Sequence, residues 1–489
     1  MQPGPDRTQG ARHDPATVGS RSYPRRVSPP RTVAVVGGGV AGLAAALTAS
    51  RAGGHVVVLE ASSQLGGKVR VSDVGGLAVD EGADAMLARL PDGVQLARDA
   101  GLGDELVSPA AGQAALWSRG RLRPLPTGTL LGVPGDLAAL ARSHALSPAG
   151  LARVPLDLVL PGSPAPDDVS VGDLVRRRLG PEVVDRLVDP LLGGVYAGRA
   201  DQLSLHATLP QLAGPVAGSR SLLLATRRAR ATATPYTGPV FRGLPGGLGR
   251  LPGAVATASG AEVRLGTTVR GLKRTPTCWR LELGSAAHPG HLDVDAVVLA
   301  VPAAPAARLL RELAPSAAAE LAGLDYASVA IVTLVLDGAT PGAGSGYLVP
   351  AAEGRTTKAV TFTSRKWAHY PDGRAVVRAS VGRHGEARDL QRGDEELVRL
   401  IRAELEAAVG PVPRTLDSRV VRWGGGLPQY AVGHLERVRR VREAVGRHPG
   451  LAVAGAAYDG VGVPAVARSG REAAQQVLAA QWRHDRHQA

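Results

Sequence analysis

The sequence of 489 residues contains a single cysteine, Cys278, and few aromatic residues. One cysteine excludes an intrachain disulfide and any metal cluster held by several cysteines. No run of about 18 apolar residues occurs, so no membrane-spanning helix is expected. Phe and Met each occur only twice, but Val, Leu and Ala are plentiful, so an aliphatic core can form. At this length we expect about two or three domains.

Lysine is also scarce, and arginine carries nearly all of the positive charge; the lysines stand at positions 68, 273, 358 and 366. The formal net charge is nevertheless +14 at pH 7. The basic residues are spread along the chain and accompany no nucleic-acid-binding motif, which argues against a nucleic-acid partner. An anionic membrane surface or a substrate with several carboxylates suits such a charge better.

The most informative segment is residues 31–70, which contains the glycine motif GGGVAG after an apolar strand at 33–36. An Ala- and Leu-rich helix follows, as in dinucleotide-binding folds. The glycines permit a tight turn, close approach of a pyrophosphate, and packing of the helix against the strand. Unpaired N–H groups at the start of the helix favour the phosphates. The residues expected to bind here are Gly37, Gly38, Gly39, Val40, Ala41 and Gly42.

A second strand at 55–59 ends in Glu60, whose carboxylate can accept hydrogen bonds from both hydroxyls of a ribose. This carboxylate argues against NADP, because it would repel a 2′-phosphate. A second glycine pair, Gly66 and Gly67, follows soon after and precedes Lys68. Such a pair is typical of flavoproteins of the glutathione-reductase type, whereas a plain hairpin turn is the alternative. We therefore expect FAD as the cofactor.

The predicted organisation is an α/β fold built discontinuously, with a glutathione-reductase-like, Rossmann-type FAD-binding domain, a mixed α+β substrate domain and a helical insertion. Residues 1–30 are rich in Pro, Arg, Ser and Gly and are expected to form a disordered basic tail. The FAD-binding segments are expected at 31–115, 236–310 and 416–489. The helical insertion is expected at 116–235 and the substrate domain, with one helix at 394–409, at 311–415.

Five further motifs extend across the chain: LEASSQLGGKVR, DEGADAMLARLP, DPLLGGVYAGRADQLS, RWGGGLPQYAVGH and GAAYDGVGVPAVARSG. Through them the chain resembles the oxygen-dependent protoporphyrinogen and coproporphyrinogen oxidases of the flavin amine-oxidase superfamily, from about residue 33 to 478. The third and fourth motifs are the most specific to the porphyrinogen oxidases, and they favour the Gram-positive bacterial type of this family. The resemblance implies a coproporphyrinogen III oxidase that forms coproporphyrin III in heme biosynthesis.

The implied reaction removes six electrons from the porphyrinogen at the flavin N5 and reduces O₂ to H₂O₂. It requires no catalytic side chain and no metal, and we predict neither. The implied partners are the porphyrinogen, O₂ and the next enzyme of the heme pathway. The expected location is the cytoplasm, with at most peripheral contact with a membrane.

The resemblance also implies cofactor contacts beyond the glycine motif. These are expected at Ala61, Gly67, Lys68, Gly82, Ala83, Asp84, Ala85, Val269, Trp423, Gly455, Val461, Gly462 and Val463. Relatives usually have Gly-Pro-Asp-Ser where this chain has residues 82–85, and this departure removes one hydroxyl contact.

Arg70 and Arg89 are the candidates for binding substrate carboxylates, because a guanidinium pairs with a carboxylate through two hydrogen bonds. The alternative for each is a solvated surface arginine. Leu90 stands where Gram-positive relatives tend to carry a basic residue, which puts the substrate preference in question. Tyr196 and Tyr430 are the candidates for lining the substrate cavity, and a core position is their alternative.

Other functions share the cofactor motifs. A protoporphyrinogen IX oxidase would use the same machinery on a more apolar substrate. An amine oxidase or carotenoid desaturase is less favoured, because few aromatics are available for an amine-binding cage and Cys278 lies far from the C-terminal position of a cysteinyl flavin. A non-enzymatic FAD-binding protein would retain the cofactor site alone.

Overall fold

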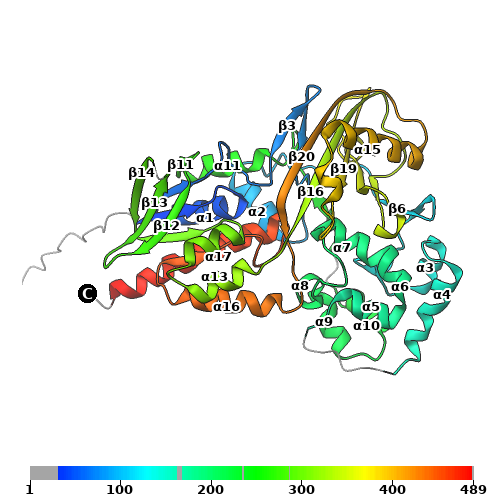
Figure 1. Ribbon diagram of the computed structural model, residues 1–489, viewed down its shortest axis with the longest axis horizontal. Coiled ribbons are helices and arrows are strands. Elements are labelled where there is room, and N and C mark those ends of the chain that lie inside the picture. Colours follow the sequence, from blue (N-terminus) through cyan, green and yellow to red (C-terminus); the bar gives the residue numbers. More distant parts are fainter. Residues whose placement is uncertain (1–30, 162–167, 234–235, 286, 487–489) are drawn as a thin grey trace, which may run out of the picture. The chain divides into compact units, whose positions relative to one another are not determined.

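The computed structural model describes residues 31–161, 168–233, 236–285 and 287–486 (Figure 1). The tail expected at 1–30 lies outside the described residues. The predicted α/β fold class is confirmed, because a parallel sheet with flanking helices adjoins a second, mixed sheet and a helical region.

A five-stranded parallel sheet forms the centre of the predicted cofactor domain. Its order is β11 (Glu262–Arg264), β2 (His55–Leu59), β1 (Thr32–Val36), β15 (Ala296–Leu299) and β21 (Leu451–Val453). The strands come from three distant parts of the chain, yet they pair side by side. β1 lies in the middle and its apolar residues are buried on both faces, as expected of a parallel sheet.

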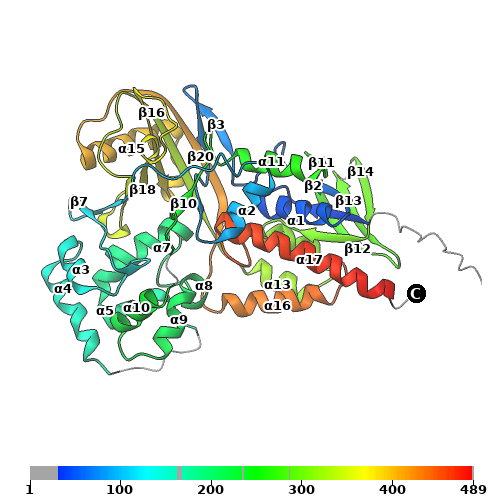
Figure 2. The ribbon, with the colours of Figure 1, turned by 180° about the vertical axis from the view of Figure 1, so that it is seen from behind.

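Two layers cover this sheet. On one face, α1 (Val40–Arg51) and α17 (Val463–Arg486) run side by side and pack against Val33 and Val35 (Figure 2). On the other face, Ala34 and Val36 meet a three-stranded antiparallel sheet and three helices. These are β12 (Val269–Arg274), β13 (Trp279–Gly284), β14 (Pro289–Val294), α12 (Ala303–Leu310), α13 (Pro315–Ala322) and α16 (His434–Gly446).

The second large sheet has seven strands. Its order is β20 (Thr415–Pro428), β16 (Tyr326–Asp337), β19 (Arg374–Val381), β18 (Thr357–Phe362), β17 (Gly346–Leu348), β6 (Ala115–Ser118) and β7 (Arg121–Pro124). Helix α15 (Asp394–Val409) covers one face with Leu397, Ile401 and Leu405. These residues recur every four positions, which is the pattern that predicts this helix at its observed bounds.

Strand pairing moves three of the expected segment boundaries. β20 pairs with β16 on both sides of a register shift at residues 424–426, so the seven-stranded sheet continues to Pro428 instead of ending near 415. β6 and β7 join the same sheet, so the segment from 116 begins with strands and not with helices. Conversely, α13 packs in the core of the cofactor domain although it lies after 310. These boundaries could not be predicted from the sequence, because they depend on pairing between distant segments and not on a local periodicity of apolar residues.

The helical region begins after the short hairpin β8 (Thr129–Leu130) and β9 (Val133–Pro134). Its main helices are α5 (Val171–Leu179), α7 (Asp189–Tyr196), α9 (Pro210–Ala217) and α10 (Leu222–Ala231), which enclose an aliphatic core of their own. Among the described residues, no helix is both long and apolar enough to span a bilayer.

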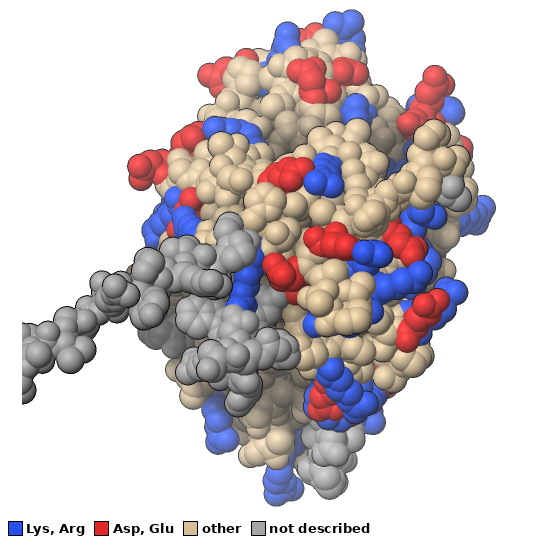
Figure 3. Space-filling model, turned by 90° about the vertical axis from the view of Figure 1, so that its left-hand side faces the viewer, with Lys and Arg blue, Asp and Glu red and all other residues tan. Residues whose placement is uncertain are grey.

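Opposite charges lie next to one another on the face shown in Figure 3. Ion pairs also form within and between neighbouring elements, since Arg439 pairs with Glu436 on α16 and Arg440 pairs with Glu320 on α13. The net positive charge of the chain is therefore interspersed with acidic side chains on this face.

Candidate functional site

The first glycine motif adopts the geometry that its sequence predicts. Gly37 has a φ of +107°, and a Cβ there would lie 2.5 Å from the carbonyl oxygen of Ala300. A Cβ on Gly42 would lie 1.9 Å from the carbonyl oxygen of Gly37, so only glycine lets α1 pack against the turn. A Cβ on Gly39, in contrast, would meet nothing within 4 Å. The N-terminus of α1 therefore faces open space, where its first N–H groups lack partners within the helix.

The second glycine pair lies beside the first. The N–H of Gly66 donates to the carbonyl oxygen of Gly38 at 2.9 Å, and Gly66 forms a bridge with Gly39. Gly66 and Gly67 both have positive φ values, which explains why this position requires glycine. The pair is thus part of the cofactor turn and not an independent hairpin.

Glu60 is held at the end of β2 by two backbone amides. Its Oε2 accepts a hydrogen bond from Gly38 N at 2.7 Å, and its Oε1 accepts one from Ser62 N at 2.8 Å. Each carboxylate oxygen can accept more than one hydrogen bond, so both remain able to bind hydroxyl groups. This arrangement suits the ribose contact expected from the sequence.

A cavity of about 730 Å³ joins the glycine turns to the seven-stranded sheet. Many of the residues predicted to contact the cofactor line it. They are Gly37, Gly39, Val40, Ala41, Glu60, Ala61, Gly67, Lys68, Gly82, Ala83, Val269, Trp423, Gly455, Val461, Gly462 and Val463. Segments from the beginning, middle and end of the chain thus meet around one space.

The residues of this cavity fit FAD. The open space at Gly39 accommodates a phosphate at the start of α1, and Glu60 lies where a ribose would follow. Lys68 is half-buried, and burial lowers the pKa of its ammonium. Its ammonium forms no hydrogen bond or ion pair with the other described residues, so a negatively charged ligand would provide its first counter-ion.

Four of the residues predicted to contact the cofactor do not line the cavity: Gly38, Gly42, Asp84 and Ala85. The Asp84 carboxylate accepts hydrogen bonds from Lys366 Nζ at 2.9 and 3.0 Å and lies 3.6 Å from the Arg378 guanidinium. Burial acts to raise the pKa of Asp84, but these two cations hold it below its usual value. Arg378 also donates to the carbonyl oxygen of Gly82 at 2.5 Å. Asp84 therefore fastens the cavity segment 82–83 to the seven-stranded sheet.

Neither predicted arginine lines the cavity. Arg89 is exposed, because the chain after Ala85 pairs with β10 (Phe241–Arg242) and buries Met86 in the core while Arg89 stays at the surface. Arg70 is half-buried, and its guanidinium carbon lies 5.7 Å from the ring centroid of Trp423, which does line the cavity. Arg89 is therefore a surface arginine, which was the alternative to substrate binding. The Trp423 ring lies between Arg70 and the cavity.

The two predicted tyrosines lie behind the cavity. Tyr430 is buried, and its hydroxyl donates to the carbonyl oxygen of Ala456, a lining residue, at 2.5 Å. Its ring lies 5.5 Å from Tyr196 and stacks at 4.0 Å on His434. Burial raises the pKa of Tyr196 to about 12. Both tyrosines are therefore core residues, as the alternative to cavity lining predicts. Tyr430 supports the turn after Gly455 through its hydrogen bond to Ala456.

Part of the cavity wall was not predicted. The seven-stranded sheet contributes Val329, Ile331, Lys358 and Ser380, and α7 contributes Gly194 and Val195. One signal was available for Lys358, because this rare lysine stands in the strand TKAVTF, whose Val360 and Phe362 are buried. A charged side chain in such a strand indicates either a partner or a ligand.

Comparison with known proteins identifies the family. A family model described as "Flavin containing amine oxidoreductase" matches residues 40–478, so the chain belongs to this family and is an oxidoreductase. This confirms the predicted superfamily and FAD as the cofactor. The coproporphyrinogen III oxidase of Mycobacterium tuberculosis (strain ATCC 25618 / H37Rv) is 36% identical, covering 92% of this chain and 98% of the relative.

Two further relatives extend the comparison. The coproporphyrinogen III oxidase of Bacillus subtilis (strain 168) is 32% identical, covering 91% of this chain and 97% of its own length. A crystal structure from Exiguobacterium sp. 255-15, described as a candidate protoporphyrinogen oxidase, is similar with a TM-score of 0.81 at 32% identity. That comparison covers 92% of this chain and 99% of the other. The similarity therefore includes both sheets and the helical region.

Proposed function

We propose that this enzyme oxidises coproporphyrinogen III to coproporphyrin III in heme biosynthesis, with O₂ as the electron acceptor. The observation that supports the proposal is the continuity of the cavity, which links the dinucleotide turns to a wall of the seven-stranded sheet. A substrate resting on that wall would lie next to the cofactor. Relatives named for this reaction match the chain over nearly its whole length.

The reaction is balanced as one coproporphyrinogen III and three O₂ giving one coproporphyrin III and three H₂O₂. FAD, when bound, would supply the two-electron redox chemistry of each of three rounds, in which the macrocycle loses two electrons and two protons that end in H₂O₂. The residues of the chain bind the cofactor and the substrate and orient them relative to each other. Glu60 accepts from the ribose, the N-terminus of α1 and Lys68 provide positive charge, and Val329 and Ile331 provide an apolar surface for the macrocycle.

Protoporphyrinogen IX is the second candidate substrate. It carries fewer carboxylates, and the aliphatic side chains of the cavity wall would suit its more apolar periphery. A location in the cytoplasm, peripheral contact with a membrane and transfer of product to the next heme-pathway enzyme remain predictions attached to this proposal.

The experiment is aerobic turnover of the purified yellow protein on both porphyrinogens, followed by porphyrin fluorescence and H₂O₂ formation. Faster turnover of coproporphyrinogen III at equal concentration would support the proposal. Faster turnover of protoporphyrinogen IX would favour the second candidate. Bound FAD without oxidation of either substrate would refute both.

A further inference from the structure

One face of the seven-stranded sheet forms the cavity wall. Val329 and Ile331 of β16 and Ser380 of β19 line the cavity, and Ile331 pairs with Ser380 in the register. The residues that alternate with them, such as Ala330 and Ala379, lie in the core on the opposite face of the sheet. The wall is therefore aliphatic and weakly polar along these strands.

Lys358 reaches this wall because of a β-bulge. In the pairing of β18 with β19, Thr357 pairs with Val381 and Ala359 with Ser380, so Lys358 is an extra residue without a partner. A bulge redirects a side chain relative to the regular alternation of a strand. Here the redirected side chain is a lysine that lines the cavity.

The bulge is fixed from the opposite side of the sheet. Glu404 of α15 accepts hydrogen bonds from the N–H groups of Thr356 and Thr357, each at 2.9 Å. Both backbone donors at the start of the bulge are thus satisfied by one carboxylate. The position of Lys358 is therefore built into the fold and does not depend on a loose loop.

Lys358 has no counter-ion among the residues that the structure describes. The residue is only 5% exposed, and its ammonium forms no hydrogen bond or ion pair with the other described residues. Burial, followed by the like charge of Arg383, lowers its pKa to about 7. Among the described residues that line the cavity, Glu60 carries the only carboxylate. Its two oxygens already accept hydrogen bonds from the backbone amides of Gly38 and Ser62. A buried cation of this kind gains most from an incoming anion.

We propose that the Lys358 ammonium pairs with one carboxylate side chain of the porphyrinogen and so determines specificity for carboxylate-rich substrates. This inference rests on the proposed function and assigns a residue for its substrate preference. Pairing would compensate the buried charge and keep Lys358 protonated while the substrate is bound. It would also orient the macrocycle on the aliphatic wall beside the cofactor turns.

The test compares Lys358→Met, Lys358→Arg and a control, Lys273→Met, all as FAD-loaded protein. Lys273 is an exposed lysine of β12 that pairs with Glu282 outside the cavity. We expect Lys358→Met to raise the KM for coproporphyrinogen III about tenfold or more, with kcat nearly unchanged. Lys358→Arg should retain most of the affinity, because it keeps the charge. Lys273→Met should behave as the wild type.

Direct binding provides a second readout that does not depend on turnover. Coproporphyrin III and its tetramethyl ester are titrated against wild type and Lys358→Met, and quenching of porphyrin fluorescence is followed. We expect the wild type to prefer the acid and the variant to lose most of that preference. FAD content and the thermal midpoint of each variant show whether it is folded, and Met keeps a long unbranched side chain at this buried position.

Three outcomes would overturn the proposal. They are an unchanged KM in Lys358→Met, an equal loss of affinity for the acid and the ester, and a fall in kcat at constant KM, which would indicate a role in proton transfer. Failure of the wild type to oxidise either porphyrinogen would refute the proposed function instead. The binding comparison would still decide the role of Lys358 in that case.

Discussion

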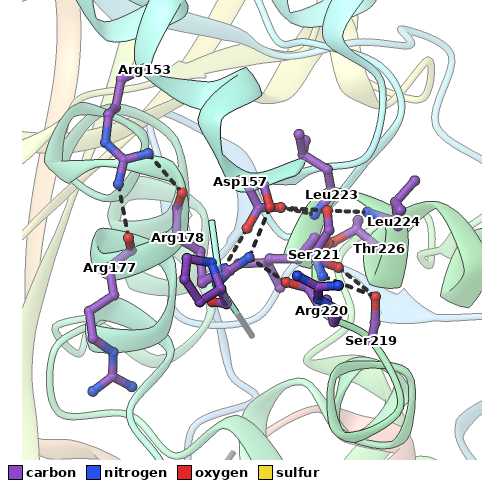
Figure 4. A network of polar contacts seen from close by, with 12 residues as sticks. Arg153, Asp157, Arg177, Arg178, Ser219, Arg220, Ser221, Leu223, Leu224 and Thr226 are labelled. Atoms are coloured by element: carbon purple, nitrogen blue, oxygen red, sulfur yellow. Dashed lines mark hydrogen bonds and ion pairs between the residues drawn. The ribbon is translucent and has the colours of Figure 1, made fainter. Parts of the chain in front are cut away.

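Asp157 and Arg178 form an ion pair in the interior of the helical region, with Arg178 Nε 2.6 Å from Asp157 Oδ1 (Figure 4). The Asp157 side chain is fully buried. Its second oxygen accepts hydrogen bonds from the Ser221 hydroxyl at 2.7 Å and from Leu223 N at 2.9 Å. One carboxylate thereby joins the 3-10 turn η1 (Val154–Leu158) to α5 and to the start of α10.

We expect Asp157→Ala to lower the free energy of unfolding by about 3–5 kcal/mol, because it leaves the Arg178 guanidinium buried without a counter-ion. Urea unfolding followed by circular dichroism measures the change. Asp293→Ala is the matched control, since Asp293 pairs with Arg280 through two hydrogen bonds at the surface. The control should change stability very little. Equal effects of the two substitutions would show that burial of Asp157 is not what matters.

Gly39 and Gly42 predict opposite consequences of the same substitution. Gly42→Ala places a Cβ 1.9 Å from the carbonyl oxygen of Gly37, so we expect a destabilised protein even without FAD. Gly39→Ala meets no protein atom within 4 Å, so the protein should fold normally and lose FAD affinity. Thermal midpoints of the FAD-free proteins, together with FAD titration by flavin fluorescence, separate these effects. Normal FAD affinity in Gly39→Ala would show that no phosphate lies against this residue.

Glu60→Ala should weaken FAD binding by roughly tenfold to a hundredfold, because it removes a charged acceptor from the ribose. The two backbone donors of Gly38 and Ser62 would also lose their partner. Glu262→Ala is the control, since Glu262 is an exposed residue of β11 that pairs with Arg264. Equilibrium dialysis of FAD against both variants gives the comparison. If Glu60→Ala and Glu262→Ala retained FAD equally, Glu60 would not be a cofactor-binding residue.

His434 predicts a dependence of stability on pH. Burial lowers its pKa to about 4, below the usual 6.5. Between these values the unfolded state binds a proton that the folded state does not, so stability falls as pH drops from 6.5 towards 4. The loss should reach roughly 3 kcal/mol and then level off at lower pH.

His434→Phe should lack this contribution and preserve the stacking on Tyr430. The stability difference between variant and wild type, measured by urea unfolding across this pH range, isolates the histidine from other titrating groups. A constant difference across the range would contradict the assignment.

The cofactor half of the molecule was predictable because its signals are local. The glycine motif, the strand at 55–59, the helix at 394–409 and the acid Glu60 each follow from a short pattern with one physical meaning. The structure places β2 and α15 at the expected bounds. Most residues assigned to FAD line one cavity.

The substrate side was harder to predict because its determinants are not local. Lys358 lines the cavity only because a bulge interrupts strand alternation, and that bulge depends on Glu404 of a later helix. The pairing of β20 is interrupted at residues 424–426, where the register with β16 shifts and Gly425 N donates to the Ser328 hydroxyl at 3.0 Å before pairing resumes at Leu427. Arg89 and Tyr430 have suitable chemistry, but pairing and packing with distant segments decide where they lie.

The cavity that joins Gly37 to Val463 also sets an order of events during protein synthesis. The wall at Gly37 is synthesised long before the turn that opens α17, because more than half of the cavity-lining segments lie between them in the sequence. A nascent chain therefore has no complete pocket for FAD until the C-terminal helix can pack against α1. Cofactor capture would mark chains that extend through α17, and chains truncated before this helix would remain colourless.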